Sequence, residues 1–432
     1  MNDWAYQTLG ELVQQDRRIT YGIVQPGPDV YPDGIPLIRG KDYSSGKVSS
    51  EGLYHVKPEV DAPYRRSKVQ GGDLLLSIAG YVGQIAIVPD VLDGANLTQT
   101  TARLSIDSCK GDSQFVYHAI NSQEFSKEID RYTKGSAQSG LNLGDVEKFR
   151  VLMPDSLCEQ REIAKILSTV DNLIEKTQTL IDKYQSIKQG MMHDLFTRGV
   201  DESGQLRPRY EDAPHLYKES ELGGIPKEWE CGRVGRYLKS INQGWSPNCD
   251  SAPAVQGKWG VLKTTAVTWQ GFNDVENKEL PSNLKPKPEH EVAIGDVLVT
   301  RAGPNTRVGV VAYVYQTRPM LMLSDKLYRL VPNSDLNGEF LSLALSSSGS
   351  QGDLSAKKTG LAESQTNISQ GIVRDILIPV PSSGEQSLIA DVVRRKSMLI
   401  EAEKVSLEKL NKVKSGLMQD LLTGKVRVKV DA

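Results

Sequence analysis

The stretch from Glu159 to Thr197 is similar in sequence to the stretch from Glu385 to Thr423. The first copy opens with Glu159-Gln160 and ends in KQGMMHDLFT (188–197), and the second opens with Glu385-Gln386 and ends in KSGLMQDLLT (414–423). Glu385 follows Glu159 by 226 residues and Thr423 follows Thr197 by 226 residues, so the two copies align without a gap. Self-similarity at a fixed offset indicates one structural unit that is used twice.

The repeat extends upstream into segments with the pattern of strands. GDLLLSIAG (72–80) corresponds to GDVLVTRAG (295–303), and VGQIA (82–86) corresponds to VGVVA (308–312) after an insertion at 304–306. Short apolar runs bounded by Gly are typical of buried strands, which predicts strands at Leu74–Ile78 and Val297–Thr300. We interpret Asp73 and Asp296 as parts of Gly-Asp turns, because no partner carboxylate recurs at a fixed spacing.

These matches predict an α+β fold with two mixed, strand-rich domains and two long helices, arranged as a tandem repeat with pseudo-twofold symmetry. A polar, turn-rich stretch after the first helix is predicted to be a linker. The predicted parts are a first globular domain at 1–155, a central helix at 156–199, a linker at 200–228, a second globular domain at 229–380, a C-terminal helix at 381–424 and a tail at 425–432.

Apolar residues in both helices recur with the 3,4 spacing of a coiled coil, which predicts a seam along which the helices pair. The register set on the first helix also places Lys396, Glu403 and Ser406 on the seam of the second, so we expect the second helix to pack less regularly. The predicted seam residues are Ile163, Ile166, Val170, Leu173, Leu180, Tyr184, Ile187, Ile389, Val392, Leu399, Leu410, Val413 and Leu417.

Composition and absent motifs exclude several classes of function. The net charge is −2, from 52 basic and 54 acidic residues, so nucleic-acid binding would have to rest on local patches. The four cysteines and five histidines show no metal-ligand spacing, which argues against a metal site. The sequence contains no phosphate-binding G-x-x-x-x-G-K-[ST] motif and no Asn/Asp-Pro-Pro-Tyr motif of an amino-methyltransferase. We find no signal peptide or membrane span and expect a cytoplasmic protein.

The order of these features resembles the specificity subunit of Type I restriction-modification systems over essentially the whole chain. The most specific stretch is YKESELGGIPKEW (217–229), which is similar to the entry of that family into its second recognition domain. The two helix endings and their Glu-Gln openings are similar to its two conserved regions. The resemblance implies two target-recognition domains that each read one half of a split, asymmetric DNA site, held apart by two antiparallel helices.

The resemblance also implies partners and cofactors. Two methyltransferase subunits would dock on the helices, and two motor-nuclease subunits would join them on double-stranded DNA. S-adenosylmethionine, ATP and Mg would belong to those partners, so this chain is expected to carry no cofactor and no catalytic residue. A helix from Glu159 to Thr197 would be about 58 Å long, which exceeds the ~34 Å of one duplex turn.

Candidate DNA-binding residues are basic, amide and aromatic side chains in loops beside the predicted strands. Arg301 occupies the position that Ile78 fills in the first repeat, so we expect a polar partner there, most simply a surface salt bridge, with a contact to DNA as the functional alternative. The candidates are Arg17, Arg18, Tyr21, Arg39, Lys41, Tyr43, Lys47, Arg65, Arg66, Tyr81, Lys134, Gln138, Gln243, Trp245, Lys263, Trp269, Arg301, Asn305, Arg307, Lys357 and Lys358.

Two other functions stay open at this point. One is a self-sufficient DNA-modifying enzyme with duplicated DNA-binding domains, against which the missing catalytic motifs count. The other is a structural coiled-coil adaptor, against which the large strand-rich domains count.

Overall fold

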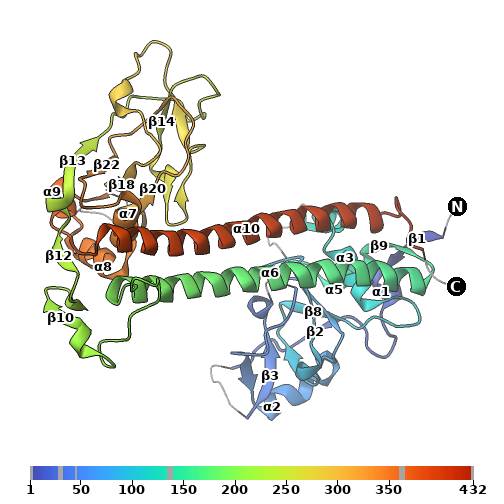
Figure 1. The fold of residues 1–432 in the computed structure, drawn as a ribbon. Coiled ribbons are helices and arrows are strands. Elements are labelled where there is room, and N and C mark those ends of the chain that lie inside the picture. The colour runs from blue at the N-terminus through green and yellow to red at the C-terminus, as the bar shows by residue number, and fades with distance from the viewer. Residues whose placement is uncertain (1–2, 28–32, 44–45, 134–139, 360–364, 430–432) are drawn as a thin grey trace. The chain divides into compact units, whose positions relative to one another are not determined.

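The chain forms two compact units in a computed structural model that describes residues 3–27, 33–43, 46–133, 140–359 and 365–429. Unit 1 combines residues 1–179 with 404–432, and unit 2 consists of residues 180–403. Each unit therefore contains one globular part together with one half of α6 (Leu157–Thr197) and one half of α10 (Ser383–Leu421) (Figure 1).

In the described residues, the globular part of unit 1 contains two small sheets, a separate strand pair and five α-helices. Its four-stranded antiparallel sheet has the order β2-β8-β5-β6, and its three-stranded sheet has the order β4-β3-β7 with β3 and β7 parallel. The strands β1 and β9 form a separate antiparallel pair. The elements are β1 (Trp4–Thr8), α1 (Leu9–Leu12), β2 (Thr20–Tyr21), β3 (Ile35–Ile38), β4 (Tyr54–Val56), α2 (Pro58–Asp61), β5 (Leu74–Ser77), β6 (Ile85–Ile87), β7 (Asn96–Leu97), β8 (Thr101–Leu104), α3 (Ser113–Ile120), α4 (Gln123–Thr133), α5 (Leu143–Lys148) and β9 (Arg150–Pro154).

Unit 2 repeats this strand order and adds the antiparallel pairs β10–β11, β15–β16 and β19–β23. Its four-stranded sheet has the order β13-β22-β18-β20, its three-stranded sheet has the order β17-β14-β21, and β12 pairs with β24. The elements are β10 (Tyr217–Ser220), β11 (Gly223–Pro226), β12 (Glu230–Arg233), β13 (Leu238–Gln243), β14 (Gly260–Leu262), β15 (Val267–Thr268), β16 (Gly271–Phe272), β17 (Asn277–Glu279), β18 (Val297–Thr300), β19 (Ala302–Gly303), β20 (Val311–Tyr313), β21 (Leu321–Met322), β22 (Leu327–Pro332), α7 (Gly338–Ser346), α8 (Ser348–Lys357), β23 (Thr366–Asn367), α9 (Gln370–Arg374) and β24 (Leu377–Val380).

The buried strands predicted from the two Gly-bounded runs are present as β5 and β18. Leu74 and Leu76 of β5 face a core shared with Phe115 of α3, whereas Leu75 faces a second core shared with Ile38 and Leu97 of the smaller sheet. In β18, Val297 and Val299 face the α7 side and Leu298 faces the other. A strand that is buried on both faces needs apolar residues at every position, which explains why these runs do not alternate with polar residues.

The Glu-Gln openings of the long helices tie each helix to its own unit. The side chain of Gln160 accepts a hydrogen bond from the Asp112 amide at 2.8 Å and donates one to the Pro154 carbonyl. Gln386 accepts from the Asn337 amide at 2.7 Å and donates to the Pro381 carbonyl. Asp112 and Asn337 cap α3 and α7, so the repeated Gln holds the same helix start in both units.

The segments after the long helices also carry structure. The stretch 200–228, predicted to be a linker, contains the antiparallel hairpin β10–β11. Arg207 from this stretch donates two hydrogen bonds to Glu385, at 2.5 and 3.1 Å. In unit 1, Arg427 from the predicted tail donates to Glu159 at 2.6 and 2.7 Å. The stretch that follows each long helix therefore contacts the first turn of the other helix.

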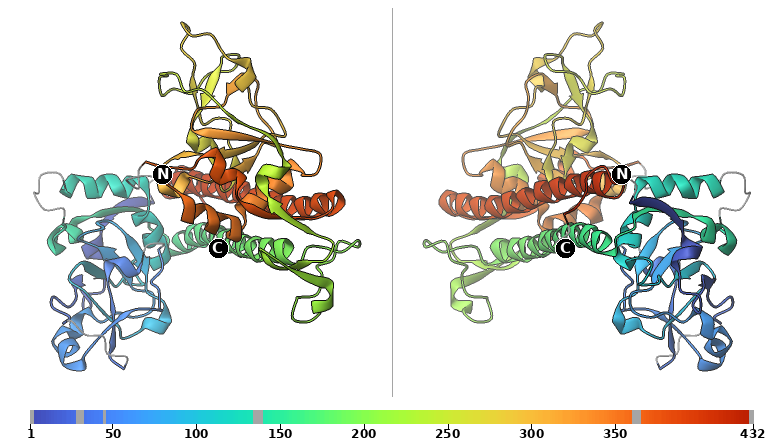
Figure 2. Two further views of the ribbon diagram at one scale, coloured as in Figure 1. Left: turned by 90° about the vertical axis from the view of Figure 1, so that its left-hand side faces the viewer. Right: turned by 90° about the vertical axis from the view of Figure 1, so that its right-hand side faces the viewer.

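Within each unit the two helix halves run side by side and antiparallel (Figures 1 and 2). In unit 1, Lys414 forms an ion pair with Asp171 at 2.7 Å, while Arg427 reaches back to Glu159. In unit 2, the Lys396 ammonium lies 4.8 Å from the centre of the Tyr184 ring, while Glu385 accepts from the Val200 amide. In both units, later residues on one helix meet earlier residues on the other.

The predicted seam is correct at one heptad position and wrong at the other. The series from Ile163 through Val170 to Tyr184, and the series beginning at Ile389, are buried or half-buried. The second predicted series is half-buried at best, and its members Leu173, Ile187, Leu399 and Val413 are 42–51% exposed. The inward position lies one residue later on both helices, at Leu167, Ile174, Ile181, Lys188 and Leu195 on α6 and at Val393, Ile400, Leu407, Lys414 and Leu421 on α10.

This correction also changes the predicted quality of the second helix. In the corrected register, α10 has apolar residues at four of the five inward positions, as α6 does, and the Lys residues lie at matched places in the repeat. At the inward heptad position, the expectation that α10 packs less regularly than α6 is therefore wrong. None of the helices in the described ranges combines the length and the hydropathy needed to cross a membrane.

Candidate functional site

Six of the nine predicted DNA-binding residues of unit 2 lie where β18 ends, in a set of loops that we call the loop end, whereas Lys263, Trp269 and Lys357 lie outside it. The loop end of unit 2 comprises residues 243–246, the β18–β20 connection (301–310), the turn Ser324–Lys326, residues 358–359 and residues 365–368. Main-chain hydrogen bonds join them: the Arg301 amide donates to the Lys326 carbonyl at 2.9 Å, and the Ile368 amide donates to the Arg301 carbonyl at 2.9 Å. Five segments of the chain thus form one surface.

Two predicted DNA-binding side chains hold the turn Ser324–Lys326 in place. The Asp325 carbonyl accepts hydrogen bonds from Gln243 Nε2 at 3.0 Å and from the Arg301 guanidinium at 3.2 Å. The Arg301 guanidinium also lies 5.5 Å from the centre of the buried Tyr328 ring. Arg301 therefore points toward the turn beneath the surface, and its observed partner is a carbonyl rather than the carboxylate of a surface salt bridge.

Other candidates of unit 2 brace the same loops. The Arg307 guanidinium donates to the Thr264 carbonyl at 3.4 Å, and the Lys358 ammonium donates to the Asn305 carbonyl at 2.9 Å. Partial burial lowers the pKa of Lys358. Trp269 is 51% exposed at the tip of the β15–β16 hairpin.

Three further candidates of unit 2 are engaged by neighbouring side chains. Lys263 lies 4.0 Å from Glu276, and Lys357 pairs with Asp353 at 2.9 Å. Trp245 packs against a cluster around Val261 and is covered by the Lys287 ammonium, 4.5 Å from its ring centre. Trp269, Asn305 and Lys357 are the exposed members of the predicted set in unit 2, and of these Lys357 is engaged by Asp353.

Unit 1 has an equivalent loop end, made of residues 22–25, the β5–β6 connection (78–84), the turn Thr98–Thr100 and the segment from Gly140. The Ile78 amide donates to the Thr100 carbonyl at 2.8 Å, and the Leu141 amide donates to the Ile78 carbonyl at 2.8 Å. These are the counterparts of the two main-chain bonds of Arg301. Tyr81 projects from this loop end with 61% exposure.

A glycine allows the close approach of loops in each unit. A Cβ atom on Gly22 would lie 1.9 Å from the Leu97 carbonyl oxygen, and one on Gly244 would lie 1.8 Å from that of Leu323. Any side chain at these positions would displace the turn that follows, so the matched glycines are required by the backbone of the loop end.

The basic cluster predicted near the start of unit 1 lies at the opposite end of β5. Arg17 forms a bidentate ion pair with Asp73, the residue that precedes β5, at 2.7 and 3.1 Å. Buried Arg103 donates to the carbonyls of Arg18 and Arg66, and its burial lowers its pKa to about 10. The structure therefore separates Arg17, Arg18, Arg65 and Arg66 from Tyr81, and the Asp73 ion pair engages Arg17.

The remaining candidates of unit 1 fall into four groups. Tyr43 is 1% exposed and its hydroxyl bonds to Thr101, with burial raising its pKa to about 12, so the prediction that it contacts DNA is wrong. Arg39 is engaged by Asp42, and Lys47 by Glu175 on α6 at 2.5 Å. Tyr21 and Lys41 are exposed. Lys134 and Gln138 lie outside the described residues.

Sequence reasoning missed the turns themselves. Gln99 of unit 1 and Lys326 of unit 2 are exposed at the loop ends, and neither was predicted. It also missed the buried Arg103 and its counterpart Arg329, which donates to the carbonyls of Glu289 and Glu291. The signal was available, because the offset of 226 that aligns the helices also aligns residues 97–104 with 323–330 without a gap.

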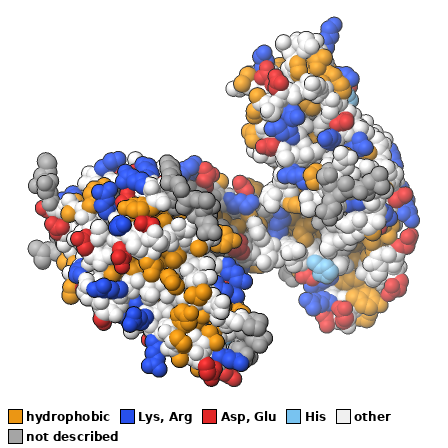
Figure 3. Space-filling view, turned by 180° about the vertical axis from the view of Figure 1, so that it is seen from behind, with side chains coloured by type: hydrophobic (Ala, Val, Ile, Leu, Met, Phe, Trp, Pro, Cys, Tyr) orange, Lys and Arg blue, Asp and Glu red, His pale blue; other side chains and the backbone are white. Residues whose placement is uncertain are grey.

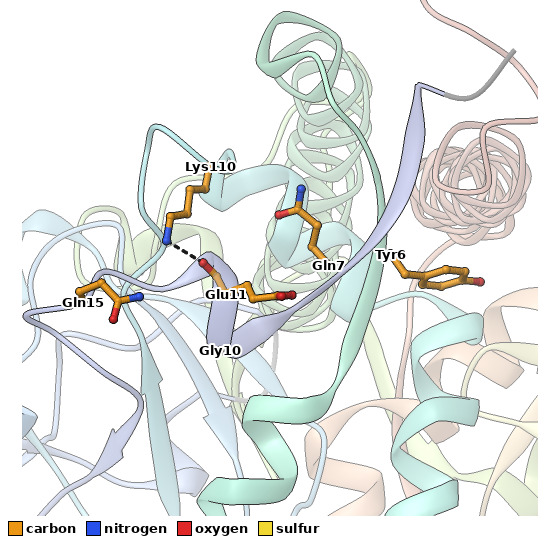
Figure 4. Close-up of a pocket in the computed structure, with 6 residues that line it drawn as sticks. All are labelled: Tyr6, Gln7, Gly10, Glu11, Gln15 and Lys110. Carbon is orange, nitrogen blue, oxygen red and sulfur yellow. Dashed lines mark hydrogen bonds between the residues drawn. The ribbon is translucent and has the colours of Figure 1, made fainter.

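Neither surface charge nor cavities indicate a catalytic centre in the described residues. On the faces visible in Figure 3, Lys and Arg side chains are interspersed with Asp and Glu. A hollow of about 510 Å³ in unit 1 is lined by polar side chains, of which Lys110 donates to the Glu11 carbonyl at 2.9 Å and Tyr6 points away from the others (Figure 4). Within the described ranges no three His, Cys, Asp or Glu side chains are placed to hold a metal ion.

Known proteins with similar sequences are specificity subunits. The chain is 42% identical over 171 residues to the EcoEI specificity subunit of Escherichia coli, covering 39% of this chain but only 29% of that protein. It is 28% identical over 416 residues to the putative MjaX specificity subunit of Methanocaldococcus jannaschii, covering 92% and 88% of the two chains. The first of these relatives is thus matched over less than a third of its length.

Solved structures share the fold. The S subunit of a type I restriction-modification system from M. genitalium superposes with a TM-score of 0.60 at 16% identity, covering 99% of this chain and 97% of that one. A chain from a second type I system, described in work on complex assembly, gives a TM-score of 0.52 at 17% identity with 99% coverage of both chains. The sequence model of the type I restriction modification DNA specificity domain matches residues 1–184 and 255–412, and the chain therefore belongs to that family.

Proposed function

We propose that this chain is the DNA-reading subunit of a type I restriction-modification complex and that it performs no catalysis itself. Unit 1 and unit 2 each read one half of a bipartite, asymmetric target through their loop ends. The long helices act as the spacer between the half-sites, and the two units are related by a pseudo-twofold arrangement that suits a duplex.

The observation that carries this proposal is the pair of equivalent loop ends. Both are held by the same main-chain hydrogen bonds and the same close glycine contact, yet their exposed side chains differ, with Tyr81 in one and Asn305 in the other. A shared backbone with different exposed side chains is what two readers of unrelated sequences require, because base edges are distinguished by side-chain donors, acceptors and apolar groups.

We further propose that two methyltransferase subunits and two motor-nuclease subunits join the chain on double-stranded DNA. S-adenosylmethionine, ATP and Mg would belong to those partners. Such partners also explain how a chain with a net charge of −2 would act on DNA, since phosphate neutralisation by Lys and Arg dominates affinity and need not come from one subunit.

The test is an exchange of domains in the assembled complex. Residues 1–155 are replaced by the matching domain of a family member with a different target, and methylated sites are mapped in DNA from cells that carry the complex. We expect one half-site to change while the other half-site and the spacer length stay the same. A change in both half-sites, or methyl transfer by the purified chain without partners, would contradict the proposal.

A further inference from the structure

The two turns Thr98–Thr100 and Ser324–Lys326 are equivalent elements at the loop ends. The Thr101 amide donates to the Thr98 carbonyl at 3.2 Å, and the Leu327 amide donates to the Ser324 carbonyl at 3.2 Å. Each turn also accepts the amide of the β5–β6 or β18–β20 connection at its last carbonyl. Its backbone is therefore fixed in the same way in both units.

Each turn engages one side chain within its own unit and exposes another. In unit 1 the Thr98 and Thr100 hydroxyls are 2.9 Å apart, and Gln99 between them is exposed. In unit 2 the Asp325 carboxylate accepts a hydrogen bond from Ser246, and the following Lys326 is exposed. The turns are the same in backbone and different in the side chain that they present.

Unit 2 fixes its turn with additional side chains. Gln243 and Arg301 both donate to the Asp325 carbonyl, and the Asp325 amide donates to the Ser246 hydroxyl at 3.1 Å. A side chain on a braced turn is presented with little loss of conformational freedom in the rest of the loop, which is what selective recognition needs.

We propose that these turns are specificity-determining elements, with Gln99 reading an adenine in one half-site and Lys326 reading a guanine in the other. The inference rests on the proposed function, in which the loop ends face DNA. The amide of Gln matches the N6 and N7 groups of adenine, and the ammonium of Lys matches the O6 and N7 acceptors of guanine in the major groove. Arg301 and Gln243 are then positioning residues for the turn.

The experiment uses the complex assembled with its methyltransferase partners and compares four variants with the wild type: Lys326→Ala, Lys326→Arg, Gln99→Lys and Lys239→Ala. Lys326→Ala and Gln99→Lys change the exposed residue of each turn. Lys239→Ala is the matched control, because Lys239 is also exposed but lies on β13 at the end of the sheet away from the turn. Binding is measured to duplexes that carry the mapped site and every single-base substitution of it, at two salt concentrations.

For Lys326→Ala we expect discrimination at one guanine to fall on the order of 10- to 100-fold, with the other half-site unchanged. For Gln99→Lys we expect one preferred adenine to be replaced by guanine in the half-site read by unit 1. Lys239→Ala should keep both half-sites. Lys326→Arg keeps a cationic donor at this position and should keep the guanine preference. Comparison of this variant with Lys326→Ala therefore distinguishes the loss of a base contact from damage to the turn.

Two outcomes overturn the inference while leaving the proposed function intact. One is an unchanged site in both turn variants when the wild-type complex reads a defined sequence. The other is an equal loss of affinity for all duplexes with a shallower salt dependence, which would make Lys326 a phosphate contact. A wild-type complex with no sequence preference would instead contradict the proposed function itself.

Discussion

Unit 1 and unit 2 have the same strand order but stabilise the start of their long helices with different chemistry. Buried Glu385 accepts hydrogen bonds from Arg207, from the Val200 amide and from the Trp229 indole. Buried Glu159 accepts from Arg427, whose side chain is 48% exposed. The indole nitrogen of Trp4, the counterpart of Trp229, is buried with no partner among the described residues. The repeat thus preserves the carboxylate but not the network around it.

The contacts between globular part and helix differ in the same way. In unit 1 the buried His118 bonds to Ser168 on α6 at 3.0 Å. At the position equivalent to Ser168, unit 2 has Arg394, which forms an ion pair with Glu339 of α7 at 2.7 Å. The difference teaches that apolar packing sets the shared topology, while polar contacts at equivalent positions are free to diverge.

The largest expected difference concerns the two helix-start carboxylates. Glu385→Gln should lower the free energy of unfolding of unit 2 by roughly 3–5 kcal/mol, because it removes the buried carboxylate nearest to the mostly buried Arg207 and leaves only the exposed Glu228, at 3.9 Å, as a charge partner. Glu159→Gln should lower that of unit 1 by roughly 1–2 kcal/mol, because Arg427 can be hydrated. Hydrogen exchange at the first turns of α10 and α6 measures the two decreases in the free energy of unfolding. Equal decreases would show that the additional hydrogen-bond partners of Glu385 do not contribute to the stability of unit 2.

The corrected helix register predicts the next effect. Leu167→Ala should cost roughly 2–5 kcal/mol in the stability of unit 1, because Leu167 is fully buried, whereas Ile166→Ala, one residue earlier and half-buried, should cost clearly less. The same order is expected for Val393→Ala against Val392→Ala in unit 2. Urea unfolding monitored separately in each unit tests this, and a reversed order would restore the register predicted from the sequence.

The buried histidine should make unit 1 more sensitive to acid than unit 2. Burial lowers the pKa of His118 to about 4, below its ordinary 6.5, so between these pH values the unfolded chain binds the proton more strongly than the folded one. Stability therefore falls as pH drops below about 6.5, by about 2 kcal/mol between pH 7 and pH 5.

Comparison with His118→Asn isolates this effect. The variant should show a flatter pH dependence in unit 1 and no change in unit 2. An unaltered pH dependence in the variant would assign the acid sensitivity to other groups near His118, such as Asp171 at 3.8 Å.

The smallest expected effect is that of the exposed ion pair between Lys47 and Glu175, whose side chains are 64% and 56% exposed. Glu175→Gln should change the stability of unit 1 by less than about 1 kcal/mol, because water and salt screen the pair. Thermal unfolding at low and high salt measures it. A larger loss would mean that this contact helps to hold the loop of Lys47 on α6.

Much of the candidate site was predictable, but its orientation was not. The loops after β5 and β18 were predicted from the matched Gly-bounded runs, and Tyr81 and Asn305 are exposed there, whereas Trp269 is exposed on the β15–β16 hairpin. Tyr43 and Arg17 were predicted for the same surface because they are aromatic or basic and lie in loops. Their partners Thr101 and Asp73 are 58 and 56 residues away in the chain, and no local sequence pattern predicts contacts over such separations.

The sequence by itself determined the duplication, the two long helices and the buried central strands, because an offset of 226 residues and apolar periodicity are written directly in it. Only the tertiary structure decided which helix face points inward. Ile166-Leu167, Leu173-Ile174 and Leu180-Ile181 offer an apolar residue at both candidate heptad positions, and a helix of 3.6 residues per turn accepts either spacing. The choice depends on the residues packed opposite, which come from distant parts of the chain.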